Sequence, residues 1–181
     1  MKKAVCSDRL FYLEFVMTDR ADHLVSLLKS QGKTITTIES CTGGLIAGAI
    51  TAISGSSNVF DYGFVTYSNA AKTALVGVPE ELLIQYGAVS LEVARAMAEG
   101  GLKRASASIA VSVTGIAGPT GGSVEKPVGM VCFGLSFTSL DGVLVTEARV
   151  RQFGAIGRNE VRQASVRFAL DWAIETLLKA G

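Results

Sequence analysis

A hydroxyl and a thiol stand side by side at what the sequence predicts to be a strand-to-helix turn. Ser40 and Cys41 follow a β-like run at residues 34–38 and, after two glycines, precede a helix-like run at residues 45–53. Backbone N–H groups at the start of a helix lack partners within it and carry the positive end of its dipole. Glycines let a ligand approach the backbone closely. We therefore predict the active site at this turn.

The usual activator of a serine nucleophile is missing from the neighbourhood. The single histidine, His23, lies in a helical pattern far in sequence from the turn, where a surface or half-buried helical histidine is the simpler interpretation. One histidine and three dispersed cysteines cannot supply the usual nitrogen and sulfur ligands of zinc. We therefore expect no metal site and no cofactor.

Lysine replaces histidine as the base in the Ser-Lys variants of acyl-transfer chemistry. Lys72 is the candidate, because small and apolar residues precede it and would desolvate its ammonium. Lowering a lysine pKa from about 10.4 to near 7 requires roughly 4 to 5 kcal/mol, which burial can supply. The residues alone equally allow the more common solvent-facing helical lysine.

Cys41 is the rival nucleophile, because a helix N-terminus lowers the pKa of a thiol. Its alternative is a small buried apolar residue. A second glycine-rich segment, residues 114–127, matches neither GxGxxG nor GxxxxGK[ST], since Lys126 is followed by Pro127. Its N–H groups could hold an anion, or it could be a flexible connection, and the residues leave both open.

The elements that must position these residues follow from periodicity and turn signals. Asp141 and Gly142 are typical of a two-residue hairpin turn. Strands alternating with helices, followed by a hairpin, predict an α/β fold, a three-layer α/β/α sandwich around a mixed, mostly parallel sheet. We expect helices over residues 20–29, 45–53, 69–76, 79–86, 90–104 and 159–178, and strands over residues 34–38, 59–67, 108–113, 128–138 and 143–153.

Length and composition indicate one globular domain at residues 17–181. Met17 before Thr18 and Asp19 would open a capped helix, so residues 1–16 are expected to be a poorly ordered extension. Of the 181 residues, 49% are hydrophobic and 18% charged, which is enough for a sizeable core.

The charge balance, 17 basic against 16 acidic residues, gives no electrostatic basis for binding nucleic acid or an anionic membrane. An odd number of cysteines without CxxC spacing suits a reducing cytoplasm. No apolar run reaches the roughly 18 residues of a membrane span. The apolar helices allow a homo-oligomer without requiring one.

At these residues the chain resembles the CinA carboxy-terminal domain family, and more closely its stand-alone members, the nicotinamide-nucleotide amidohydrolases. The resemblance runs from about Met17 to the last helix. It rests on several motifs taken together, at residues 37–44, 63–72, 87–90, 114–119 and 126–129.

The resemblance implies hydrolysis of the carboxamide of nicotinamide mononucleotide to nicotinate mononucleotide and ammonia, in pyridine nucleotide recycling, by a Ser-Lys hydrolase without a metal. It implies Ser40 as the nucleophile and Lys72 as its base, with Tyr67 orienting or desolvating Lys72. N–H groups of residues 41–44 would receive the oxyanion. The residues then expected to bind substrate are Cys41, Thr42, Gly43, Gly44, Thr114, Gly115, Gly118, Gly121, Gly122, Arg158 and Arg162.

Two points stay open at this stage. Either arginine could meet the substrate phosphate or be an exposed helix charge. Larger family members carry an additional amino-terminal domain with pyrophosphatase activity, which we do not expect here. The alternative function is a non-catalytic nucleotide-binding or protein-interaction module that retains the pocket.

Overall fold

The computed structural model describes the backbone of residues 4–139 and 141–179, and side chains from residue 18 onward. The expected extension, residues 1–16, lies outside the residues whose side chains are described, and it stays a prediction. The first helix, α1, spans Ala4–Gln31 and so includes the predicted helix at residues 20–29.

A five-stranded sheet with the order β2-β1-β3-β4-β5 forms the middle of the molecule. Its strands are β1 (Ile35–Glu39), β2 (Gly63–Val65), β3 (Ile109–Gly115), β4 (Met130–Thr138) and β5 (Leu144–Gln152). Strand β1 pairs in parallel with β2 and β3, whereas the β3–β4 and β4–β5 pairs are antiparallel. The predicted mixed sheet is confirmed, with parallel and antiparallel pairs in equal number because β4 and β5 extend the sheet as a meander.

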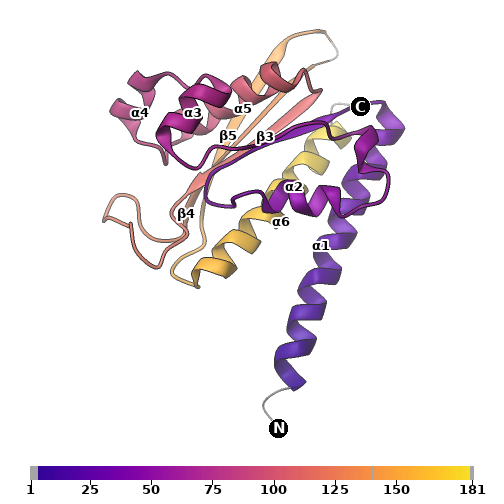
Figure 1. Ribbon diagram of the computed structural model, residues 1–181, viewed down its shortest axis with the longest axis horizontal. Helices are drawn as coiled ribbons and strands as arrows, with labels where there is room; N and C mark the ends of the chain where they lie inside the picture. Colours follow the sequence, from indigo (N-terminus) through magenta and orange to yellow (C-terminus); the bar gives the residue numbers. More distant parts are fainter. Residues whose placement is uncertain (1–3, 140, 180–181) are drawn as a thin grey trace.

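Helices cover both faces of the sheet (Figure 1), which confirms the three-layer sandwich. Helices α1, α2 (Leu45–Thr51) and α6 (Arg158–Lys179) lie on one face, and α3 (Asn69–Val76), α4 (Glu80–Tyr86) and α5 (Leu91–Ala105) lie on the other. A hydrophobic cluster fills each interface. Strand residues alternate between the clusters, so β1 and β3 are buried on both faces. Among the described residues, no helix is both long and apolar enough to span a bilayer.

Two predicted strand boundaries need correction. The strand expected at residues 59–67 is only β2; just before it, the Tyr62 carbonyl accepts from the Thr36 hydroxyl at 2.7 Å instead of from a ladder amide. The predicted hairpin is present, but its turn is longer than two residues. The Ser139 amide donates to the Val143 carbonyl at 2.9 Å across this turn.

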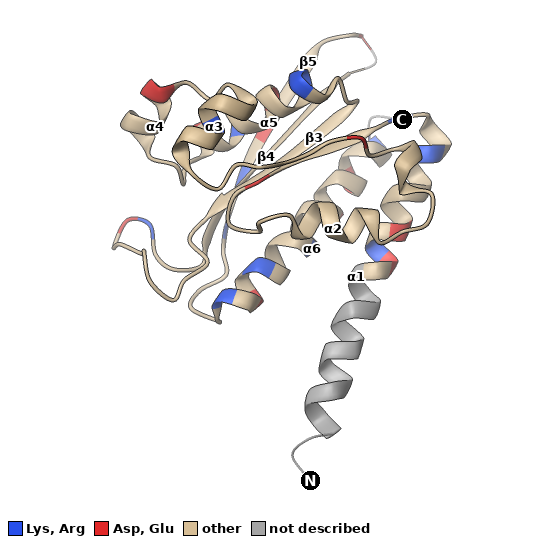
Figure 2. Cartoon of the chain, viewed as in Figure 1, with Lys and Arg blue, Asp and Glu red and all other residues tan. Residues whose placement is uncertain are grey.

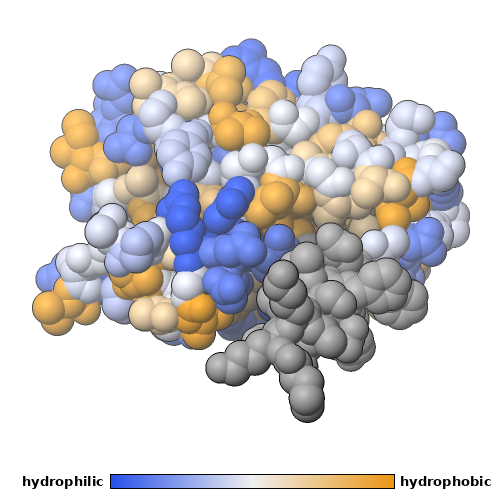
Figure 3. Space-filling model, turned by 60° about the horizontal axis from the view of Figure 1, so that its bottom comes forward, coloured by the Kyte–Doolittle hydropathy of each residue, from blue (hydrophilic) through white to orange (hydrophobic). Residues whose placement is uncertain are grey.

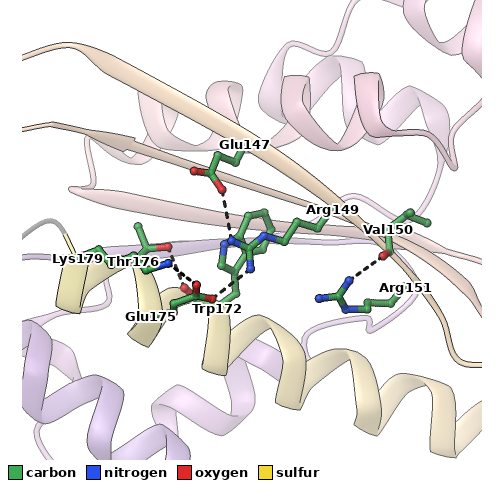
Figure 4. A network of polar contacts seen from close by, with 8 residues as sticks. All are labelled: Glu147, Arg149, Val150, Arg151, Trp172, Glu175, Thr176 and Lys179. Carbon is green, nitrogen blue, oxygen red and sulfur yellow. Dashed lines mark hydrogen bonds and ion pairs between the residues drawn. The ribbon is translucent and has the colours of Figure 1, made fainter.

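Arg149 joins the edge strand β5 to helix α6 (Figure 4). Its guanidinium lies 4.4 Å from the centroid of the Trp172 ring and donates to Glu175 at 3.1 Å. Lys179 donates to the same carboxylate at 2.6 Å, and this bond, followed by that of Arg149, lowers the pKa of Glu175. The network links β5 to the C-terminal half of α6.

Helix α5 approaches two neighbours closely through adjacent glycines, β1 at Gly101 and α3 at Gly100. A Cβ atom on Gly101 would collide with Cγ1 and Cδ1 of Ile38, and one on Gly100 would collide with the Val76 carbonyl. This close approach packs α5 against β1, the strand that Ser40 follows, and packs α3 against α5.

Substitution Gly101→Ala should therefore destabilise the fold by about 1–3 kcal/mol, the usual cost of overpacking a core. Gly48→Ala, in the interior of α2 with no atom within 4 Å of the added methyl group, is the matched control. It should stabilise the fold by about 0.5–1 kcal/mol through helix propensity. Urea unfolding of both variants measures the difference, and equal effects of the two substitutions would contradict the packing argument.

Candidate active site

The carboxyl ends of three parallel strands meet at one edge of the sheet. Ser40 follows β1, Thr66 follows β2 and Thr114 lies at the end of β3. Register places Glu39 opposite both Val65 and Val113, so the three ends are level. The chain continues from β1 into α2 on one face of the sheet and from β2 into α3 on the other (Figure 1). Ligands of α/β proteins commonly bind at the strand ends where the chain diverges in this way.

Lys72 lies in the interior and reaches Ser40. Helix α3 begins at Asn69 because the Ser68 side chain accepts from the Ala71 amide, and this start directs Lys72 toward the strand ends. Its side chain is 1% exposed, with Nζ 3.1 Å from Ser40 Oγ and 2.9 Å from the Thr66 carbonyl oxygen.

Burial lowers the pKa of Lys72 from its ordinary value of 10.5, because the charged ammonium loses its hydration. A neutral amine keeps two N–H donors and gains a lone pair. One N–H can donate to the Thr66 carbonyl while the lone pair accepts the proton of the Ser40 hydroxyl. The geometry is therefore that of a general base beside a nucleophile.

The surroundings of Cys41 do not favour a reactive thiolate. Its side chain is buried in the hydrophobic cluster beneath α1, α2 and α6. Burial, followed by the charge of Glu39, raises the thiol pKa to about 12, which outweighs the lowering by its own backbone N–H, Lys72 and Arg162. The thiol is protonated at neutral pH, so desolvation overrides the helix-start effect that made Cys41 a rival to Ser40.

The amides at the N-terminus of α2 are bonded by a side chain of the protein, that of Glu39. The Glu39 carboxylate is buried and accepts from the amides of Gly44, Ile46 and Ala47 at 3.0, 3.1 and 2.8 Å. The Gly43 amide donates to the Ser40 carbonyl at 3.1 Å. Of the N–H groups near residues 41–44 that were expected to receive an oxyanion, those of Gly43 and Gly44 are therefore already bonded within the protein.

In the described part of the chain, the amides of Cys41 and Thr42 donate to no other residue, although the Cys41 amide also faces its own thiol, and both amides directly follow Ser40 in the sequence. Gly43, with φ +62°, allows the backbone to reverse between them and α2. The two glycines shape the turn rather than the wall of the pocket.

A cavity of about 250 Å³ opens over Ser40 and Lys72. Of the predicted site residues, seven line it, whereas Thr42, Gly43, Gly44, Gly118, Gly121, Gly122 and Arg162 do not. Ala88 comes within reach because its carbonyl accepts from the Thr114 hydroxyl at 2.8 Å. The sequence prediction omitted four lining residues, and all four fall in the motifs at residues 63–72, 87–90 and 114–119. They are Asn69, Ala88, Val89 and Ala117. The full lining is Ser40, Cys41, Tyr67, Asn69, Lys72, Ala88, Val89, Thr114, Gly115, Ala117 and Arg158.

The two arginines of α6 have different surroundings. Arg158 lines the cavity and donates to the Tyr67 hydroxyl at 3.0 Å and to the Gly118 carbonyl at 2.9 Å. Arg162 instead donates to the carbonyls of Cys41 and Thr42 at 3.2 and 2.9 Å. Basic residues mark the first turns of α6 (Figure 2), and strongly hydrophilic side chains gather between apolar ones on the face shown in Figure 3.

Tyr67 takes a different place from the one expected. Its ring is 61% exposed, and its hydroxyl bonds Arg158 rather than Lys72. The Lys72 amine bonds the Thr66 carbonyl and the Ser40 hydroxyl, and Tyr67 lines the same cavity. Within the described residues, no group of three His, Cys, Asp or Glu side chains could hold a metal ion.

Comparison with known proteins supports a single relationship. Residues 17–177 match the model of the CinA C-terminal domain. A nicotinamide-nucleotide amidohydrolase, PncC, from Enterobacter agglomerans is 55% identical over 152 residues, which are 84% of this chain and 90% of that protein.

A CinA-like protein from Citrifermentans bemidjiense is 49% identical over 158 residues, which are 87% of this chain but only 36% of that longer protein. The crystal structure of the competence/damage inducible protein CihA from Agrobacterium tumefaciens superposes with a TM-score of 0.82 at 47% identity, covering 88% of this chain and 94% of that one. The chain belongs to the CinA C-terminal domain family.

Proposed function

We propose that this protein is an amidohydrolase that converts nicotinamide mononucleotide to nicotinate mononucleotide and ammonia. The observation that carries the proposal is the buried Lys72 amine 3.1 Å from the Ser40 hydroxyl, within the cavity at the strand ends. The similarity to PncC supports the substrate class.

The reaction would proceed through an acyl-enzyme. Ser40 Oγ attacks the carboxamide carbon while its proton passes to neutral Lys72. The oxyanion would be received by the amides of Cys41 and Thr42, and each such donor is worth about 3–4 kcal/mol. Lys72 then protonates the departing nitrogen, so ammonia leaves. A water molecule then loses a proton to Lys72 and attacks the ester carbon, and Lys72 returns that proton to Ser40 Oγ as the ester bond breaks and nicotinate mononucleotide is released.

Arg158 is the residue we propose for the substrate phosphate. It alone of the two arginines lines the cavity, and its guanidinium offers donors in a planar fork that suits a phosphate. Tyr67, bonded to Arg158, would hold that guanidinium at the cavity rather than act on Lys72. We place the activity in pyridine nucleotide recycling in the cytoplasm, where the free thiols of Cys41 and Cys132 would stay reduced.

The first test is ammonia release from nicotinamide mononucleotide by the purified protein. Ser40→Ala and Lys72→Ala should each lower kcat by about 10³-fold or more, because nucleophile and base act as a unit. Cys41→Ala should retain activity within about tenfold, with Cys132→Ala as the matched control for loss of a buried thiol. Circular dichroism checks the fold. Activity that survives Ser40→Ala but disappears in Cys41→Ala would make the thiol the nucleophile, and nucleotide binding without turnover would favour the non-catalytic module.

The pH dependence of kcat tests Lys72 as the base. Only the neutral amine can accept the proton of Ser40, so activity should be low in acid and rise as pH passes through the lowered pKa of Lys72. The midpoint of this limb should lie below 10.5, the ordinary value. A midpoint at or above that value would contradict the assignment.

The same burial should appear in the stability of the fold. Between the lowered pKa of native Lys72 and 10.5, the unfolded chain binds a proton that the native protein does not. The free energy of unfolding of the wild type, relative to Lys72→Met, should therefore rise with pH across that window, by up to about 1.4 kcal/mol per pH unit. Urea unfolding at several pH values measures the slope. Loss of the bond to Thr66 in Lys72→Met shifts its free energy of unfolding by the same amount at every pH. A difference between the two proteins that does not change with pH would therefore contradict a lowered pKa of Lys72.

A further inference from the structure

We propose that Glu39 and Arg162 are positioning residues that hold the Ser40 turn from opposite sides and touch no substrate. The proposal rests on the proposed function for its kinetic consequences, whereas its structural consequences can be measured without any substrate. It assigns to Arg162 a role different from the phosphate contact expected of it, and a role to Glu39, which the sequence prediction did not include.

Glu39 holds the N–H side of the turn. Three amides beyond the turn converge on its carboxylate at 2.8–3.1 Å, and the residue is 1% exposed. Its backbone is also fixed, because its carbonyl accepts from the Thr66 amide at 2.8 Å within the strand ladder. A single residue thus ties the end of β1 to the first turn of α2, with Ser40 between them.

Arg162 holds the carbonyl side. Its Nε and Nη2 donate to the successive carbonyls of Cys41 and Thr42, a fork that fixes the plane of both peptide groups. Those peptide groups carry the N–H of Thr42 and Gly43. The orientation of the proposed oxyanion donor at Thr42 therefore depends on a residue of α6.

The charges complement the dipoles of the turn. An anion faces its N–H groups and a cation faces its carbonyls, as each group requires electrostatically. Glu39 and Arg162 form no ion pair with each other among the described residues, so each charge is directed to the backbone. The 3.1 Å contact between Ser40 Oγ and Lys72 Nζ is thereby set by residues outside the pair.

The kinetic test compares nicotinamide mononucleotide with nicotinamide riboside, which has the same amide but no phosphate. Arg162→Met should lower kcat on the order of 10²-fold, the cost of a misplaced nucleophile, and lower kcat/KM by the same factor for both substrates. Arg162→Lys should recover only part, because one ammonium cannot reproduce the fork. Arg158→Met is the contrasting variant, and it should lower kcat/KM more for the mononucleotide than for the riboside.

Glu39→Gln should lower kcat at least tenfold with little change in KM, because the amide NH₂ would face backbone donors. The matched control is Arg104→Met, which removes an arginine that also bonds a carbonyl, that of Leu75 at 3.1 Å, away from the site. Arg104→Met should leave kcat for both substrates within twofold of the wild-type value. A rise in KM confined to the mononucleotide in Arg162→Met would show a phosphate ligand and overturn the proposal for Arg162.

Hydrogen exchange provides the readout that needs no substrate. Amides of residues 43–47, which are all hydrogen-bonded in the native turn, should exchange at least tenfold faster in Glu39→Gln and Arg162→Met than in the wild type or Arg104→Met, in proteins that thermal unfolding shows to be folded. Unchanged exchange would overturn the positioning role. Faster exchange in a protein that releases no ammonia from nicotinamide mononucleotide would refute the proposed function while leaving the positioning role in place.

Discussion

The contact between the Lys72 amine and the Ser40 hydroxyl is the constraint on which the rest of the site depends. An ammonium this deeply buried would lose most of its hydration, and its hydrogen-bond partners among the described residues are the Thr66 carbonyl and the Ser40 hydroxyl. The interior therefore favours the neutral amine, which is the form that can accept a proton. Burial, normally a cost for lysine, would supply the neutral base that the proposed mechanism requires.

The sheet makes that contact possible by placing a central strand between two parallel neighbours. Ser40 continues β1, and Thr66 continues β2, so both reach the same edge at the same level. Helix α3 then begins only three residues after Thr66 and returns Lys72 over that edge. Close packing of α5 at Gly100 and Gly101 keeps this layer against β1.

At the turn itself, desolvation and the helix start act in opposite directions, and desolvation prevails. A helix start favours negative charge, which alone would make Cys41 reactive. The protein places the Glu39 carboxylate there instead, and the thiol lies in the apolar core. One anion thus satisfies the helix start, leaving a hydroxyl rather than a thiolate at the cavity.

The sequence by itself determined the α/β layers, the strand-to-helix turn at Ser40 and, through its motifs, the family, because these depend on local periodicity and on contiguous residues. It also pointed to Lys72, since small apolar neighbours are visible in the chain. Only the tertiary structure separated Arg158 from Arg162 and paired the Tyr67 hydroxyl with Arg158. The physical reason is that these roles depend on which backbone carbonyl or hydroxyl lies across the fold, at separations of 91 and 120 residues in the chain, which no local pattern encodes.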